Sequence, residues 1–165
     1  MRAMPGKEKS AEPRSLALKV RRTAFVMDRI IGRALARDGG LSLPHCMMLY
    51  FAARFPGVTQ RTIASHLDLT EAAVSRQAEL LRRRGLIIRG RNPESRRERT
   101  VTLTPEGRRA LAAARRRVRG IMDRFFSVLR PAERKVMAAA FDRLFAAMAA
   151  ECRPGACPAM AEEAL

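Results

Sequence analysis

The chain has 165 residues, of which 47% are apolar, and a formal net charge of +17. This length suits a single domain with short arms, and the apolar fraction is sufficient for a hydrophobic core. The positive charge indicates an anionic partner, most commonly nucleic acid, although arginine supplies nearly all of it and codon bias is the alternative. Three cysteines are too few for a disulfide scaffold. Because neither a signal peptide nor an apolar run of about 20 residues is present, we expect a cytoplasmic protein without a membrane partner.

The N-terminal part of the sequence predicts a flexible arm followed by a long helix. Residues 1–14 contain prolines, a glycine and several charges but little that could be buried. Residues 16–37 carry apolar side chains at helical spacing among basic ones, which is typical of an amphipathic helix. The Gly39-Gly40 pair predicts where that helix ends.

A second helix is predicted after this glycine pair. Ser42 and Pro44 have the character of an N-cap and a first-turn proline. The helix is rich in methionine and phenylalanine and ends before Pro56-Gly57. Side chains of this kind at helical spacing indicate a core helix rather than a cofactor site.

The next two helices form the centre of the sequence. Thr59 predicts the N-cap of a short helix over residues 60–67, and residues 68–70 make a turn into a fourth helix. In that fourth helix one face is apolar, with Val74, Ala78 and Leu81 at steps of four and three. The opposite face is small at its beginning and cationic further along. Two helices joined by a short turn form a helix-turn-helix, whose second helix enters the major groove of DNA.

A change of periodicity after the fourth helix predicts a β-hairpin. Residues 86–89 and 99–103 are rich in β-branched side chains, and residues 90–98 between them are polar and rich in turn formers. The alternative to a DNA-binding wing is an ordinary solvated hairpin. The arginines in or beside this hairpin are Arg89, Arg91, Arg96, Arg97 and Arg99.

The last part of the sequence predicts two more helices and a tail. Thr104, Pro105 and Glu106 provide an N-cap, a first-turn proline and an acid for a long helix, which Pro131 ends. A final helix follows, and residues 151–165 form a tail. Both terminal regions are more apolar than one small domain needs, so they bury each other or a second copy. We therefore expect a mainly α fold with a small β-hairpin, in one domain over residues 15–150.

Several segments, in this order, resemble the multiple-antibiotic-resistance regulator (MarR) family of bacterial transcription factors. These are Leu41-Ser42, residues 55–60, Val74-Ser75-Arg76, residues 80–89 and residues 96–107. The resemblance implies a winged helix-turn-helix over residues 42–104 and a homodimer built from residues 15–38 and 108–150. It also implies binding to pseudo-palindromic operator DNA and release by a small molecule or an oxidant.

One departure from the family pattern concerns the wing. The family has an aspartate two places before the second wing arginine, where this sequence has Ser95. That acid normally helps to fix the wing arginine. Glu94 and Glu98 are the candidates to replace it.

The predicted DNA contacts fall into two groups. For the helix arginines Arg76 and Arg82, the alternative to a DNA contact is an ordinary solvated helix face. Side chains at the start of the fourth helix are expected to reach base edges, namely Ala72, Ala73, Ser75 and Arg76. The expected backbone and minor-groove contacts come from helix N-termini and basic side chains, namely Gln60, Thr70, Arg82, Arg91, Arg96 and Arg97. Arg91 is alternatively a brace within the wing.

The sensing function has weaker sequence signals. Met47, Met48 and Phe51 are the candidates to line an effector pocket. The candidate redox residues are Cys46, for which a buried core thiol is the alternative, and Cys152 and Cys157, for which an inert tail is the alternative. His45 and His66 lack further ligands at suitable spacing, so neither a metal site nor a cofactor is predicted.

Competing functions remain open at this stage. A basic winged helix could bind nucleic acid without sequence preference, or its outer helix could bind a partner protein. An enzyme is not expected, because we find neither a glycine-rich phosphate loop nor a nucleophile–base pair. The sequence does not distinguish a repressor from an activator.

Overall fold

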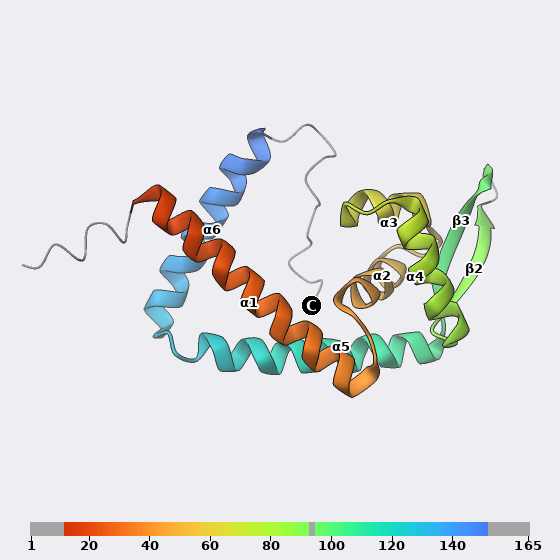
Figure 1. The fold of residues 1–165 in the computed structure, drawn as a ribbon, viewed down its shortest axis with the longest axis horizontal. Coiled ribbons are helices and arrows are strands. Elements are labelled where there is room, and N and C mark those ends of the chain that lie inside the picture. Colours follow the sequence, from red (N-terminus) through yellow and green to blue (C-terminus); the bar gives the residue numbers. More distant parts are fainter. Residues whose placement is uncertain (1–11, 93–94, 152–165) are drawn as a thin grey trace, which may run out of the picture.

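The computed structural model of the chain describes residues 12–92 and 95–151. In this part of the chain, six helices and a small three-stranded sheet form an elongated molecule (Figure 1). Helices α2, α3 and α4 gather with the sheet at one end. Helices α1 and α5 cross beside this group and extend away from it towards α6. The mainly α fold with a small sheet is confirmed.

Helix α1 (Pro13–Gly39) is longer than the sequence predicts. The expectation of an arm over residues 1–14 is wrong for Pro13 and Arg14, which lie in the helix, and residues 1–11 lie outside the described part. Proline at the first helical position has the right φ angle and lacks only an N–H that would have no partner there. At the other end Gly40 adopts a left-handed conformation with a φ of 58°, so the glycine pair ends the helix as predicted.

Helix α2 (Leu43–Arg54) passes through the middle of the core. Ser42 is its N-cap, as predicted: the Ser42 hydroxyl accepts from the His45 N–H at 3.3 Å. In return, the Ser42 N–H donates to Nδ1 of His45 at 3.1 Å. Residues 46–52 are all buried, so this helix is enclosed on every side over two turns.

Helix α3 (Gln60–Leu67) begins and ends as the sequence predicts. The hydroxyl of Thr59 caps it by accepting from the N–H of Thr62 at 3.1 Å. The turn that follows contains no glycine because Asp68 takes the left-handed conformation, with a φ of 51°. Aspartate tolerates this conformation better than most residues do.

Helix α4 (Glu71–Arg83) is the second helix of the helix-turn-helix. Thr70 caps it by accepting from the N–H of Ala73 at 3.2 Å. The predicted inner face is confirmed, because the side chains along it are 0% exposed; these are Val74, Ala78 and Leu81.

Strands β2 (Ile87–Asn92) and β3 (Ser95–Leu103) form the wing. The prediction that residues 90–98 form a turn is wrong for most of them, because the ladder continues through the pair Arg91 and Arg99 to Asn92 and Ser95. A further contact supports this extension, since Nδ2 of Asn92 donates to a carboxylate oxygen of Glu98 at 2.7 Å.

A third strand completes the sheet. Strand β1 (Val58–Thr59) pairs antiparallel with β3, placing Val58 opposite Val101, and the strand order is β1-β3-β2. The sequence predicts only a two-stranded hairpin, because two residues are too few to show an alternating pattern. This short strand fixes the wing to the start of α3.

Helix α5 (Pro105–Phe126) starts directly after the wing, with Thr104 as its N-cap. The helix ends before Pro131, and α6 (Pro131–Glu151) follows after a short turn. Near its start α5 packs very closely on the chain that precedes the wing. A Cβ atom on Gly107 would lie 2.0 Å from the carbonyl oxygen of Leu86, so only glycine fits at this position.

The hydrophobic core is concentrated at the winged-helix end of the molecule. It is built from α2, the inner faces of α3, α4 and α5, the sheet and the last turns of α1. Large apolar side chains on the first part of α1 and on α6 remain exposed; they include Leu18, Phe25, Val26, Phe141, Leu144, Phe145 and Met148.

Candidate nucleic-acid interface

The outer face of α4 is shaped as the sequence predicts. Ala72 and Arg76 are exposed, whereas Ala73 and Ser75 are partly buried. The first two turns therefore present small side chains and one long cation to the solvent. A helix of this shape can approach base edges closely, and an exposed guanidinium can donate two hydrogen bonds to a guanine.

The two predicted phosphate contacts at helix N-termini have different environments. Thr70 is exposed at the start of α4. The side chain of Gln60 is only 6% exposed and points at Arg89. For Gln60, the backbone N–H at the start of α3 is therefore the group available to a phosphate.

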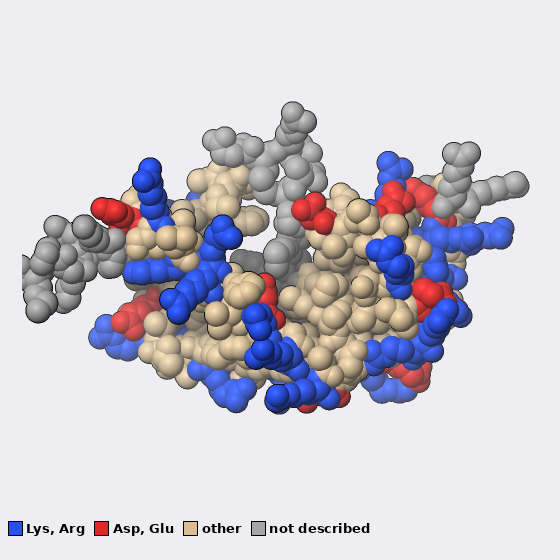
Figure 2. Space-filling model, in the orientation of Figure 1, with Lys and Arg blue, Asp and Glu red and all other residues tan. Residues whose placement is uncertain are grey.

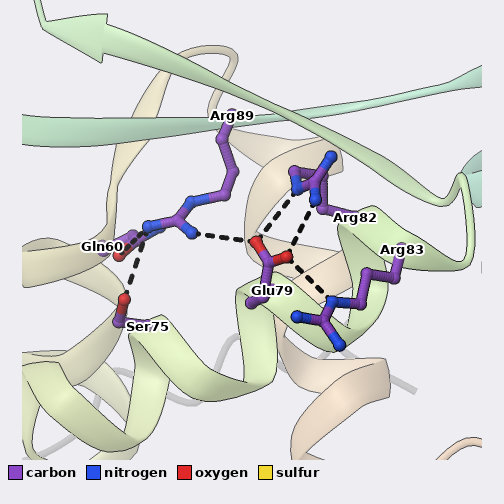
Figure 3. A network of polar contacts seen from close by, with 6 residues as sticks. All are labelled: Gln60, Ser75, Glu79, Arg82, Arg83 and Arg89. Carbon is purple, nitrogen blue, oxygen red and sulfur yellow. Dashed lines mark hydrogen bonds and ion pairs between the residues drawn. The ribbon is translucent and has the colours of Figure 1, made fainter.

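Arg89 of β2 connects the wing to both helices of the helix-turn-helix (Figure 3). Its guanidinium donates to Oε2 of Glu79 at 3.3 Å and to the hydroxyl of Ser75 at 3.3 Å. With the amide oxygen of Gln60 turned towards it, that oxygen accepts from Nε at 3.0 Å and from Nη2 at 3.2 Å. Three elements are thus held by one partly buried arginine.

Glu79 is the acceptor that several arginines share (Figure 3). Arg82 donates to its two carboxylate oxygens at 2.9 and 2.8 Å, and Nε of Arg83 donates at 3.0 Å. Hydrogen bonds from Arg82 first, and from Arg83 second, lower the pKa of Glu79 to about 2. The carboxylate is therefore ionised at any physiological pH.

This network changes the expectation for Arg82. The sequence predicts that Arg82 contacts a phosphate. In the structure the Arg82 guanidinium instead donates two hydrogen bonds to the carboxylate of Glu79 in the same helix. One carboxylate faces three guanidinium groups, including those of Arg83 and Arg89, so the cluster keeps an excess of positive charge. Arg82 remains exposed and has further N–H donors that a phosphate could accept from.

An open groove lies between α3, α4 and the sheet. Its volume is about 360 Å³. Its lining contains three arginines and two carboxylates, so it is strongly polar; the residues are Gln60, Arg61, Glu71, Ala72, Ser75, Arg89, Glu98 and Arg99.

The wing adds exposed positive charge beside this groove. Arg91 and Arg99 face each other across β2 and β3 and are both exposed. The side chains of Arg96 and Arg97 lie outside what the structure describes, as does Glu94. Glu98 bonds to Asn92 and so braces the two strands near Ser95.

Positive charge is not confined to this end of the molecule. Lysine and arginine side chains gather both around the wing and along α1 (Figure 2). The distribution of positive charge alone therefore does not identify the interface. The network around Glu79 is the better indication that the interface lies at the winged-helix end.

The three candidate pocket residues all lie in the core. Met47 is 9% exposed, Met48 0% and Phe51 4%. The ring of Phe51 stacks with those of Phe55 and His66, at centroid distances of 6.4 and 5.0 Å.

A cavity with an apolar wall lies instead between the end of α1 and α5. Its volume is about 360 Å³. Apolar side chains and charged groups both line it; these include Leu35, Leu41, Ala114, Asp38, Arg116 and Arg117.

The environment of Cys46 favours a core role over a redox role. The side chain is 0% exposed, and burial raises the pKa of its thiol to about 11. The thiol is therefore neutral at physiological pH, whereas reactive cysteines are thiolates in accessible surroundings. Cys152 and Cys157 lie outside the described residues, so their redox role stays a prediction.

Two general features concern metals and membranes. Across residues 12–92 and 95–151 we find no group of three or more His, Cys, Asp or Glu side chains placed to bind a metal ion. In the same part of the chain no helix is both long and apolar enough to cross a bilayer.

Sequence reasoning missed the role of Glu79 and the contacts that hold the interface together. Glu79 has Arg82 and Arg83 three and four positions later, a spacing that indicates helix ion pairs. The contacts of Arg89 with Gln60 and Ser75 carry no such local signal, because the partners are far apart in the sequence.

Comparison with known proteins agrees with this arrangement. The sequence model of the MarR family matches residues 39–98, which include α2, α3, α4 and most of the wing. A protein of Thauera aromatica described as a transcriptional regulatory protein for the hcr operon is 28% identical over 130 residues, covering 79% of this chain and 78% of that protein.

Solved structures show the same fold. A MarR-family transcriptional regulator from Rhodococcus sp. RHA1 has a TM-score of 0.70 and 24% identity, covering 81% of this chain and 94% of that one. CouR from Rhodococcus jostii RHA1, bound to p-coumaroyl-CoA, has a TM-score of 0.66 and 25% identity, covering 78% and 88%. The helix-turn-helix and most of the wing thus match the MarR family of transcriptional regulators over residues 39–98, and the chain has the fold of the Rhodococcus MarR-family regulator over 81% of its length.

Proposed function

We propose that the protein binds a pseudo-palindromic DNA operator as a homodimer and regulates transcription from it. The observation that carries this proposal is the outer face of α4. Ala72 and Arg76 are exposed on its first two turns, while its inner face is locked into the core. Such a helix has the shape and the donors that reading of the major groove requires.

Within this proposal the residues have separate tasks. Arg76 and Ser75, with the small Ala72 and Ala73 beside them, face base edges. Phosphate oxygens accept from the exposed positive side chains and from N–H groups at helix starts; the residues proposed are Gln60, Thr70, Arg82, Arg91, Arg96 and Arg97.

The second copy is proposed to pair through the terminal helices. Phe25 on α1 is 61% exposed, and Phe145 on α6 is 57% exposed. Large apolar side chains in such numbers are unusual on the surface of a monomer. MarR regulators bind DNA and typically dimerise, and pairing of these faces gives the two-fold symmetry that a palindrome matches.

We propose that a small molecule releases the protein from DNA, as in a repressor. The relative CouR is bound to p-coumaroyl-CoA, and the regulator PcaV from Streptomyces coelicolor was solved with its natural ligand. In this chain the cavity between α1 and α5 combines apolar side chains with Arg116 and Arg117, which suits an apolar ligand with an anionic group. An oxidant acting at Cys46 is disfavoured by the burial of that thiol.

Two alternative functions, an enzyme and a non-specific nucleic-acid-binding protein, have less support. Against an enzyme, members of this family are transcription regulators and not enzymes. A winged helix that binds nucleic acid without sequence preference accounts for the charge, but it gives no reason for the small residues at the start of α4.

The proposal is tested by selecting duplexes from a random library and comparing affinities at one salt concentration. We expect the selected palindrome to bind about 1,000-fold or more tightly than a scrambled duplex of the same composition. A ratio near one would contradict the proposal and support non-specific binding.

A further inference from the structure

The C-terminal end of α1 is held by arginines from two other parts of the fold. Arg84, the residue that follows α4, donates from Nη1 to the carbonyl oxygen of Gly40 at 2.6 Å and from Nη2 to that of Gly39 at 2.5 Å. Nε of Arg117 on α5 lies 2.7 Å from the carboxylate of Asp38. Three consecutive residues at the end of one helix are thus tied to α4 and to α5.

The way α1 ends makes its carbonyl oxygens available to Arg84. The N–H of Gly40 donates to the carbonyl of Ala36 at 3.1 Å, and the N–H of Leu41 donates to that of Leu35 at 3.4 Å. These bonds close the helix and leave the last carbonyl groups without a partner inside it. They lie at the negative end of the helix dipole, where a guanidinium binds favourably.

Arg84 directly connects two helices that pack mainly on other elements. Helix α1 packs mainly on α5 and α2, whereas α4 packs mainly on α3, α2 and β2. Arg84 lies between the last residue of α4 and Gly85, which takes a φ of 70° on the way to β2. A force on the end of α1 is therefore transmitted to the junction of α4 and the wing.

We propose that Arg84 is a positioning residue that sets the angle between α1 and α4 and so determines which half-site spacing the dimer accepts. This inference rests on the proposed function, in which α1 pairs with the second copy and α4 reads a half-site. A dimer of this kind places two recognition helices one DNA turn apart, about 34 Å. One extra base pair both lengthens the spacing and rotates the second half-site by about 35°. Without the Arg84 link, α4 tilts more easily on α1, and more spacings become acceptable.

The test is a series of duplexes that carry the selected half-sites at centre-to-centre distances of about 8 to 13 base pairs. The variant is Arg84→Gln. The matched control is Arg83→Gln, which removes the same charge from the adjacent position. Arg83 is 71% exposed and pairs with Glu79 of its own helix, so it has no part in the link to α1.

We expect wild type and Arg83→Gln to prefer one spacing strongly over its neighbours. In Arg84→Gln that preference should fall by about tenfold or more, because two charge-assisted hydrogen bonds are lost, while base preference within each half-site is unchanged. A spacing profile that matches wild type in Arg84→Gln overturns the inference. Equal weakening at every spacing, as from a lost phosphate contact, also overturns it.

Arg84→Lys keeps the positive charge but lacks the planar fork that reaches two carbonyl oxygens. It should also broaden the spacing profile, and an unchanged profile overturns the inference. This variant decides the question if Arg84→Gln does not fold.

A second measurement needs no DNA, so it separates this inference from the proposed function. Spin labels are placed on α1 and α4 through Arg29→Cys and Arg76→Cys, with Cys152 and Cys157 replaced by serine and labelled chains diluted with unlabelled protein. The distribution of label distances should be wider in Arg84→Gln and Arg84→Lys than in wild type, and equal widths overturn the inference. If wild type prefers no duplex, the proposed function fails, and this width still decides the role of Arg84.

Discussion

Arg89 and Arg91 are two positions apart on β2 but have different surroundings. Arg89 lies over α4 and is bonded to Ser75, Glu79 and Gln60, whereas Arg91 lies nearer the tip and is exposed. From the sequence, both residues are predicted only as arginines of the wing. The structure therefore divides these cations into one that organises the interface and one that is available to DNA.

This division leads to a prediction about stability. Arg89→Gln should lower the free energy of unfolding by about 1–3 kcal/mol, because it leaves the buried amide of Gln60 and the hydroxyl of Ser75 without their charged donor. Arg91→Gln should change it by less than about 0.5 kcal/mol. Urea unfolding of both variants measures the difference, and equal effects would contradict the role given to Arg89.

His45 provides a prediction about pH. Burial lowers the pKa of His45 from its usual 6.5, and the nearby Arg84 lowers it further, against an opposing effect of the Gln77 side chain. The unfolded chain therefore takes up the proton more readily than the folded one, so stability is full above pH 6.5 and falls as the pH drops below it. Protonation also removes the Nδ1 acceptor that bonds the N–H of Ser42.

His45→Gln tests this, because glutamine at this position can still complete the capping box but does not titrate. Urea unfolding at pH 7.5 and at pH 5.5 should show a smaller loss of stability in the variant than in wild type. The same loss in both proteins would exclude His45 as its source.

At the scale of elements, the sequence predicts helix starts well. Thr59, Thr70 and Thr104 each accept from a backbone N–H three residues later. The sequence predicts Thr59 and Thr104 as caps, whereas it predicts Thr70 only as part of the turn that leads into α4. The inner face of α4 follows from spacing alone, because the helical period fixes which side chains share a side.

Features that depend on distant partners could not be predicted in this way. Strand β1 exists because Val58 meets Val101, and the wing strands extend because they pair with each other past the expected turn. Arg84 reaches carbonyl groups more than forty residues away in the sequence. Such contacts are set by tertiary packing and leave no local periodic pattern.

Two glycines of α5 give a matched prediction at this scale. Gly107→Ala would place Cβ 2.0 Å from the backbone oxygen of Leu86, whereas a Cβ on Gly120 meets no other heavy atom within 4 Å. Gly107→Ala should destabilise the protein by about 2 kcal/mol or more, since backbone must move. Gly120→Ala should stabilise it by about 0.5–1 kcal/mol through helix propensity. Thermal unfolding compares them, and a neutral Gly107→Ala would contradict the close packing of α5 on the wing.

At the scale of the whole molecule, the two ends have different character. The buried core lies at the winged-helix end, while large apolar side chains are exposed on the first part of α1 and on α6. Figure 1 shows these two helical segments at the opposite end of the molecule from the wing. This contrast supports a second copy as the missing partner of the terminal helices.

Phe25→Glu tests that pairing. Phe25 is 61% exposed in the single chain, so the substitution should leave the monomer folded but weaken dimerisation by about 100-fold or more, because it buries an unpaired charge. Ile88→Glu is the control, since Ile88 is 60% exposed on the wing and lies far from the proposed dimer face. Sedimentation over a range of concentrations measures both, and an unchanged dimer in Phe25→Glu would rule out this face.

The central claim is that α4 reads bases, and a scan of single base substitutions across the selected half-site tests it most directly. Binding of each duplex is measured at one salt concentration for wild type and for Arg76→Ala. We predict that Arg76→Ala loses about 1–3 kcal/mol of discrimination at one position in each half-site and keeps its preferences at the others. A uniform loss of affinity across all duplexes, with every preference retained, would contradict the claim.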